Sequence, residues 1–282
     1  MKISEAIEKI KAYHKGDLMG TPIDPAATRD KILYGDPDQE LKGIVTTCYA
    51  SVEVIRQAAA KGANLIVCHE ALFWNHGDHT DWLKDNKTFQ DKTALLQEAG
   101  IVVWRDHDYI HSGIPLKDGV YTDGIFYGLM KILGWEEYLT CDPVREWPAK
   151  FTLPATTVRA LGQELMSRLR LNGIKVIGSP DSPVHKVWIP GHIDGRNDRE
   201  IIQTIEAEDI DTILSLECID YTVSEYIRDS TMSGHPRTIL ATGHFNTEEP
   251  GMEYMLTYLP QALGEDVPCS FVPCADMYEF LI

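Results

Sequence analysis

The stretch that most constrains the fold is residues 42–74, which has the pattern of a strand, a helix and a second strand. The second strand, 63–68, carries consecutive apolar residues, as is typical of a parallel strand covered on both faces. Gly62 stands where the intervening helix would end. A right-handed connection of this kind puts both strand carboxyl ends at one edge of the sheet, where ligands bind in open α/β sheets. His69 and Glu70, directly after the second strand, are therefore in the right place for a site.

Helices and strands alternate along the rest of the chain. Apolar residues at helical spacing predict helices at 88–99, 123–135, 156–171, 198–208, 221–232 and 251–263. Short apolar runs predict strands at 101–104, 174–177, 186–189, 210–216 and 237–241, and a closing strand region at 268–280. This alternation predicts the α/β class with largely parallel strand pairing.

The composition narrows the classes of function. With 282 residues, the chain can form one large α/β unit or two small lobes, and its formal net charge of -17 disfavours nucleic acid and anionic membranes as partners. Six cysteines form no C-x-x-C pair, which fits a reducing compartment. The N-terminus lacks the apolar core of a signal peptide, and no apolar run approaches the ~20 residues of a membrane span. We expect a soluble, cytoplasmic protein.

Histidines and carboxylates follow three of the predicted strands. They are His69 and Glu70, then His107 and His111, then His244 and Glu248. Because imidazole and carboxylate bind hard or borderline divalent ions, such clusters along one sheet edge predict a site for Zn, Mn, Fe or Co. The alternative for any single pair is a solvated loop or a satisfied buried histidine. Adjacent strand residues point to opposite faces, so both His69 and Glu70 reach one site only if the strand ends there.

Other polar residues have weaker claims on a site. His76, Asp78 and His79 fit a surface loop better than a metal site, and His192 fits a surface turn. Glu217 ends a predicted strand and is a candidate for supporting the ligands from behind. The chain contains no G-x-x-x-x-G-K-[ST], G-x-G-x-x-G or G-x-S-x-G motif, so it offers neither a ready-made phosphate cradle nor a nucleophile elbow.

Three segments resemble the Nif-three-like family, also described as GTP cyclohydrolase type-two-like dinuclear-metal proteins. They are CHEALFW at 68–74, VWRDHDYIH at 103–111 and GHFNTEEPG at 243–251. The resemblance covers nearly the whole chain, and the last segment is the most specific. It implies a single Nif-three-like unit over 1–282 with two interlocked α/β lobes, the first about 1–117 plus 236–282 and the second about 118–235. It also implies a two-metal site.

The resemblance also assigns roles to individual residues. The implied metal ligands are His69, Glu70, His111, His244 and Glu248. Two of these residues are unusual, because Glu70 stands where the family has a second histidine and His111 where it has aspartate. The count of three imidazoles and two carboxylates is nevertheless kept, which leads to the hypothesis that Glu70 supplies the bridging carboxylate. His107 and Glu248 are the implied catalytic groups, His107 through proton transfer.

Two functions follow from these residues and from the resemblance. The first is a hydrolase-like enzyme that uses two divalent ions, Zn, Fe, Mn or Co, on a small polar or nucleotide-like substrate. The second is a non-catalytic metal-binding, interaction or regulatory protein. The resemblance further implies a homo-oligomer, commonly a hexamer, in which Trp82, Trp135 or Trp147 would be exposed interface anchors.

Overall fold

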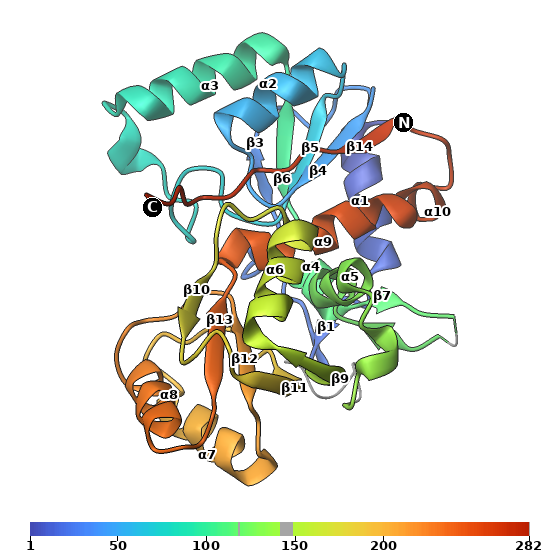
Figure 1. Ribbon diagram of the computed structural model, residues 1–282. Helices are drawn as coiled ribbons and strands as arrows, with labels where there is room; N and C mark the ends of the chain where they lie inside the picture. The colour runs from blue at the N-terminus through green and yellow to red at the C-terminus, as the bar shows by residue number, and fades with distance from the viewer. Residues whose placement is uncertain (118, 142–148, 282) are drawn as a thin grey trace. The chain divides into compact units, whose positions relative to one another are not determined.

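The computed structural model describes residues 1–117, 119–141 and 149–281 of the chain (Figure 1). Two compact units are present, the first formed by Met1–Gly128 and Glu248–Cys274 and the second by Leu129–Thr247 and Ala275–Ile282. This division differs from the one based on the sequence, which assigned 236–282 to the first lobe. The physical reason is that strand β13 (Thr238–Ala241) pairs with two strands of the second unit.

The first unit is built on a five-stranded sheet with the order β14-β4-β5-β6-β3. Its strands are β14 (Cys269–Phe271), β4 (Ile44–Thr47), β5 (Leu65–Cys68), β6 (Val102–Arg105) and β3 (Ile32–Tyr34). The first four of these are parallel and only β3 runs antiparallel to its neighbour. The predicted α/β class with largely parallel pairing is confirmed.

Helices cover both faces of this sheet (Figure 1). They are α2 (Val52–Ala60) and α3 (Lys87–Ala99) on one face, and α1 (Ile3–Tyr13) and α10 (Leu259–Leu263) on the other. Along β5, Leu65 and Val67 pack toward α1 and α10, while Ile66 and Cys68 pack toward α2 and α3. This two-residue period explains why the strand has to be apolar at every position.

The second unit has its own five-stranded sheet, with the order β10-β13-β12-β11-β9. Besides β13, its strands are β10 (Lys175–Ile177), β12 (Thr212–Ser215), β11 (Pro183–Trp188) and β9 (Lys150–Thr157). The three central strands are parallel and the two outer ones antiparallel. In both units, then, parallel strands bring their carboxyl ends to one edge.

Helices also cover the second sheet. They are α6 (Val158–Leu169), α7 (Asp198–Glu208) and α8 (Val223–Met232). Helices α7 and α8 pack with Ile239 in one apolar cluster. Helix α6 instead approaches Leu240, the next residue of β13, through Gly162. Because neighbouring strand residues face opposite ways, α6 lies on the face opposite α7 and α8.

The remaining elements complete the two units. They are β1 (Asp17–Leu18), β2 (Thr21–Pro22), η1 (Asp81–Leu83), α4 (Asp108–Ser112), β7 (Ile114–Pro115), β8 (Tyr121–Thr122), α5 (Gly124–Leu133), η2 (Glu136–Tyr138), α9 (His244–Tyr254) and η3 (Met255–Thr257). Across the described ranges, no helix combines the length and apolar character needed to cross a membrane.

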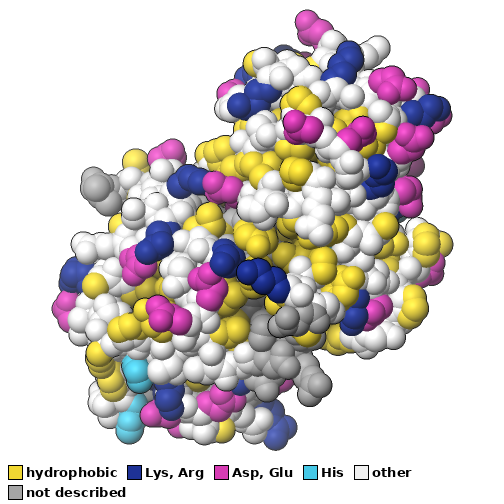
Figure 2. Space-filling model, turned by 90° about the vertical axis from the view of Figure 1, so that its right-hand side faces the viewer, with side chains coloured by type: hydrophobic (Ala, Val, Ile, Leu, Met, Phe, Trp, Pro, Cys, Tyr) yellow, Lys and Arg dark blue, Asp and Glu magenta, His cyan; other side chains and the backbone are white. Residues whose placement is uncertain are grey.

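Two sequence-based expectations concern the surface. One is its charge, which disfavours nucleic acid and anionic membranes, and the other is the exposure of three tryptophans. On the face drawn in Figure 2, acidic and basic side chains are interspersed. Of the expected interface anchors, Trp82 is 65% exposed, but Trp135 is only 3% exposed, so its expected exposure is wrong. Trp135 is buried because its indole packs edge-on against Phe151, with ring centroids 5.1 Å apart. Trp147 lies outside the described residues.

Candidate metal centre

His69 and Glu70 begin the loop that follows β5. The strand ends at Cys68, and the backbone N–H groups of His69 and Glu70 both donate to the Cys48 carbonyl, at 3.0 and 2.9 Å. The chain therefore leaves the extended conformation at this point. Both side chains are buried and offer ligand atoms to the same group. Their adjacency is no obstacle to a shared site, because the alternation of a strand no longer applies.

Three imidazoles gather at this sheet edge in the first unit. Those of His69 and His107 stack with centroids 4.5 Å apart, and His111 lies 4.9 and 5.0 Å from the other two. His107 directly follows the Asp106 that ends the β6 region, and His111 is carried one turn later by α4. One ring nitrogen from each lies within 4.8 Å of the others, so this group could hold a metal ion.

Each of these imidazoles has its Nδ1 held by an oxygen. The partners are the Asp106 carbonyl for His69 at 3.1 Å, Asp108 Oδ1 for His107 at 2.9 Å and Asp123 Oδ2 for His111 at 2.7 Å. This arrangement leaves Nε2 as the nitrogen available to a metal ion, as is usual for histidines that bind metal. His69 Nε2 is fully buried and has no hydrogen-bond partner among the described residues. A buried nitrogen that accepts no hydrogen bond is suited to be a ligand of a metal ion.

The local charges set the protonation of these rings. Burial, followed by repulsion from His107 and His111, holds the pKa of His69 well below its ordinary value. His69 therefore stays neutral and keeps the lone pair that a metal needs. Burial also lowers the pKa of His111, but the Asp123 carboxylate and its hydrogen bond outweigh this and raise that pKa to about 9.

Two carboxylates join His69 in a second, overlapping group. His69, Glu70 and Glu248 are all buried and place one ligand atom each within 4.8 Å of one another. His69 Nε2 and Glu248 Oε2 are 3.7 Å apart. Glu70 Oε2 also lies 3.3 Å from a guanidinium nitrogen of Arg105, which is fully buried. Arg105 therefore offsets the charge of Glu70, which the sequence reasoning did not foresee.

Helix α9 corrects an expectation about the third segment. We expected His244 and Glu248 on a loop, with a helix starting near Pro250, but both residues lie within α9 and Pro250 is inside it. The Gly243 carbonyl accepts hydrogen bonds from the backbone N–H of Thr247 at 3.1 Å and from its hydroxyl at 2.7 Å. The first helical turn is thus closed before Pro250 is reached.

His244 belongs to a different group, in the second unit. Its Nδ1 lies 3.3 Å from Glu217 Oε1, and His192 Nδ1 lies 3.0 Å from Glu217 Oε2. Burial raises the pKa of Glu217, but the hydrogen bonds from His192 and His244 outweigh it and lower that pKa to about 2. The three could hold a metal ion, and a pocket of about 120 Å³ lies beside His244 and Glu217.

The expected site residues fall into two sets, one in each unit. His69, Glu70, His107, His111 and Glu248 meet in the first unit, and His244 joins Glu217 in the second. His192 is exposed, as the turn sequence predicts, but it also joins Glu217, because it follows β11 as Glu217 follows β12. Asp123 was not among the predicted site residues. The available signal was its position at the start of a predicted helix, where aspartate is a common cap. In the structure it caps α5 by accepting from the Ile125 and Phe126 N–H groups.

A buried lysine secures the loop that follows Glu70. The Lys92 ammonium donates a hydrogen bond of 2.7 Å to the Leu72 carbonyl and lies 4.7 Å from the centroid of the Tyr49 ring. Burial lowers the pKa of Lys92 from 10.5 to about 8. The fold therefore disfavours the charged form, and between these two values the unfolded chain binds more protons than the folded chain.

We expect the free energy of unfolding to gain a contribution from Lys92 as the pH rises from about 8 to 10.5. Lys92→Met removes that contribution, which amounts to at most about 3 kcal/mol for a shift of this size. Urea denaturation of both proteins at pH 7 and pH 10 measures it, because other titrating groups cancel in the difference. Parallel pH profiles for the two proteins would contradict the expectation.

The chain is similar to known proteins over most of its length. The family model described as Duf34/NIF3 (NGG1p interacting factor 3) matches residues 1–276. A GTP cyclohydrolase 1 type 2 homolog of Clostridium acetobutylicum is 21% identical over 239 residues, which are 82% of this chain and 81% of that protein.

Solved structures share the fold. A hypothetical protein of Staphylococcus aureus matches with a TM-score of 0.70 and 15% identity, over 100% of this chain and 99% of the other. A Bacillus cereus protein related to NIF3 matches with 0.69 and 13%, over 100% and 99%. Reduced HcgD from Methanocaldococcus jannaschii matches with 0.62 and 17%, over 95% and 97%. With these relatives, the histidine and glutamate groups fit a metal-binding protein.

Proposed function

Because the chain belongs to the Duf34/NIF3 family, we propose that its first unit binds divalent metal and serves a hydrolase-like reaction on a small polar or nucleotide-like substrate. The observation that carries this proposal is the shared orientation of three imidazoles. In His69, His107 and His111, an oxygen holds the Nδ1 atom. One ring nitrogen of each imidazole lies within 4.8 Å of a ring nitrogen of the other two. Structural histidines have no reason to leave a buried Nε2 without a partner, as His69 does.

The donors determine which ions suit the site. Imidazole nitrogens and carboxylate oxygens favour Zn, Fe, Mn or Co, and the described groups contain no cysteine. The two groups that share His69 supply five side chains in the first unit, enough for the two ions that we propose. Glu248 would be the carboxylate that offsets the charge of bound ions best, because Arg105 already offsets the charge of Glu70.

The proposed reaction uses the chain's own residues around the metal. When bound, the ions would polarise a substrate oxygen and lower the pKa of a water. His107 has its Nδ1 fixed by Asp108 at 2.9 Å, so its Nε2 is the atom that can accept or return a proton. The Glu248 carboxylate, buried beside His69, would offset the positive charge of the ions.

A non-catalytic, metal-binding role is the second candidate. The observation in its favour is burial, since His69, Glu70 and Glu248 are 0%, 6% and 4% exposed. A fully ligated, closed site is typical of structural metals, whereas catalytic sites keep one position open. Turnover by the metal-loaded protein separates the two functions.

The metal content of the purified protein tests the proposal first. We expect the reloaded protein to hold two divalent ions per chain by elemental analysis. His69→Ala and Glu248→Ala should each weaken metal binding by at least the roughly 10 to 100-fold that supporting residues contribute. His235→Ala, which replaces an exposed histidine directly after a turn, is the matched control. His244→Ala tests whether the second unit contributes to the count.

Screening the metal-loaded protein against nucleotides and phosphoesters then tests the reaction. Less than about one tenth of an ion per chain after reloading would contradict a site as tight as structural metal centres are. Metal binding without turnover of any substrate would favour the second candidate.

A further inference from the structure

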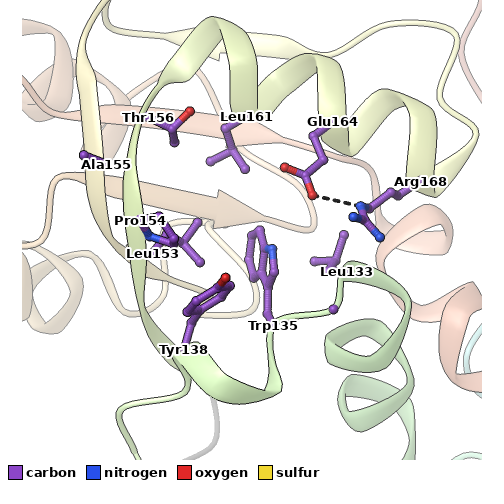
Figure 3. Close-up of a pocket in the computed structure, with 11 residues that line it drawn as sticks. Leu133, Trp135, Tyr138, Leu153, Pro154, Ala155, Thr156, Leu161, Glu164 and Arg168 are labelled. Carbon is purple, nitrogen blue, oxygen red and sulfur yellow. Dashed lines mark hydrogen bonds and ion pairs between the residues drawn. The ribbon is translucent and has the colours of Figure 1, made fainter.

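The second unit contains a pocket of about 370 Å³ that the metal chemistry does not use (Figure 3). It is bordered by α6, by β9 and by the turn after α5. Its lining residues are Leu133, Gly134, Trp135, Tyr138, Leu153, Pro154, Ala155, Thr156, Leu161, Glu164 and Arg168. A volume of this size lies within the range of small-molecule sites.

Leucine and aromatic side chains form one part of the pocket lining. Leu133, Leu153 and Leu161 are each less than 5% exposed. Gly134, at a φ of 67°, turns the chain at the end of α5 and brings Trp135 into the interior. The indole is fixed from behind by Phe151, and Figure 3 shows the rings of Trp135 and Tyr138 next to each other. Trp135 is almost fully buried, whereas the partly exposed Tyr138 ring offers a face on which a flat ring can stack.

One charged pair stands at the rim. Glu164 and Arg168 lie one helical turn apart on α6, on the same side as Leu161. Arg168 Nε donates to Glu164 Oε1 at 2.8 Å and Arg168 Nη1 donates to the Ile132 carbonyl at 3.0 Å. The guanidinium is thus engaged by two oxygens, while only one oxygen of Glu164 accepts from it. Figure 3 shows the Glu164 carboxylate directed toward Trp135.

The surroundings of Tyr138 are acidic. Glu137, and to a lesser degree Glu164, raise the pKa of the Tyr138 hydroxyl. An anion in the pocket would therefore meet two carboxylates and would have to displace Glu164 from Arg168. A cation over the Tyr138 ring would instead be attracted by the ring and by both carboxylates.

The neighbouring sheet edge does not favour a peptide strand as the occupant. Strand β9 is an edge strand, but Pro154 has no N–H to donate. The pairing with β11 also shifts between Val184 and Lys186, so that three residues of β9, 153–155, lie opposite one residue of β11. A bulge and a proline are the features that protect edge strands from strand addition.

We propose that this pocket binds a small planar aromatic cation, an amidine or a protonated heteroaromatic amine. The ring would stack on Tyr138, next to the edge of Trp135, and its N–H groups would donate to the oxygen of Glu164 that Arg168 does not use. The site is separate from the metal centre, so it does not depend on the proposed metal chemistry.

Benzamidine, a flat aromatic amidinium, is a suitable probe for the full chain. We expect isothermal titration calorimetry to give one benzamidine per chain, bound at least about tenfold more tightly than benzoate of the same shape, as one charged hydrogen bond implies. Glu164→Gln should weaken benzamidine by at least about tenfold for the same reason. Arg159→Gln, a charge change on the same helix outside the lining, should alter it less than twofold.

Arg168→Gln separates the two rim charges. It should leave benzamidine binding unchanged or make it tighter, because it keeps the recognising carboxylate and removes a cation that competes for it. An equal loss in Arg168→Gln and Glu164→Gln, tighter binding of benzoate, or no benzamidine binding at about 10 mM would each overturn the proposal. The comparison of benzamidine with benzoate uses the unaltered protein, so the test does not depend on the folding of any variant.

Discussion

Replacing Arg105 with methionine is expected to lower the free energy of unfolding by about 3 to 5 kcal/mol, the range for breaking a buried ion pair. The Arg105 side chain is fully buried and donates to the carbonyls of His69 and His76, at 3.1 and 3.3 Å. It also lies 3.3 Å from Glu70 and 3.4 Å from Asp78. Methionine fills a similar volume but leaves the buried Glu70 carboxylate without its cation.

A second substitution shows how much of the stability loss comes from the Glu70 carboxylate that Arg105 no longer neutralises. Adding Glu70→Gln to Arg105→Met should recover part of the stability, and the double-mutant cycle by urea denaturation gives the coupling. Arg56→Met, at an exposed position on α2, is the matched control and should change stability by less than about 0.5 kcal/mol. A loss below about 1 kcal/mol for Arg105→Met would show that the pair contributes no more than an exposed one.

The same variant tests whether Glu70 binds metal. If it does, saturating zinc supplies the missing positive charge, and the loss caused by Arg105→Met becomes smaller in the metal-loaded protein. If the loss is the same with and without zinc, Glu70 serves Arg105 alone. The bridging role expected for Glu70 from the sequence would then be wrong.

Gly251→Ala is expected to destabilise the first unit by about 3 kcal/mol, at the upper end of typical overpacking. A Cβ on Gly251 would lie 2.4 Å from Ile125 Cα and 2.8 Å from the Ile125 carbonyl oxygen. A Cβ on Gly128 would in turn lie 2.5 Å from Gly251 Cα. Helices α5 and α9 therefore touch backbone to backbone, and no flexible side chain can move aside.

Thermal denaturation of Gly251→Ala beside Gly162→Ala measures this effect. Gly162 is also a helical glycine, but a Cβ there would meet only Ile174 and Leu240 side-chain atoms, at 3.6 and 3.8 Å. Gly162→Ala should stabilise the protein by up to about 1 kcal/mol through helix propensity. Equal behaviour of the two variants would contradict the close packing. Because Glu248 lies on the same helix, Gly251→Ala should also weaken metal binding.

The sequence predicted those features that depend on local pattern. Uninterrupted apolar runs required strands buried on both faces, and the helices between them required parallel pairing. That pairing alone places His69 and Glu70 near His107, because the carboxyl ends of β5 and β6 meet at one edge. The alternation was strong enough that the class and the sheet edge followed from it.

Local pattern was misleading where tertiary contacts outweigh it. Pro250 suggested a helix start, yet α9 begins at His244, because Gly243 closes the first turn and Gly251 packs against α5. A turn sequence correctly suggested an exposed position for His192, whose side chain is 45% exposed, but gave no sign that the parallel strands of the second unit bring it to Glu217. The neighbours that local pattern could not supply, α5 beside Gly251 and Glu217 beside His192, are remote in sequence.

Which side chains accompany each candidate ligand was decided only by the tertiary structure. Asp123 reaches His111 from the start of α5, and Arg105 reaches Glu70 from the neighbouring strand. The physical reason is that spacing along the chain fixes which residues stand at a sheet edge, whereas their rotamers, burial and charge partners depend on elements packed there from elsewhere in the chain. The sequence thus brought together the candidate metal ligands of the first unit, and the fold determined their protonation and orientation.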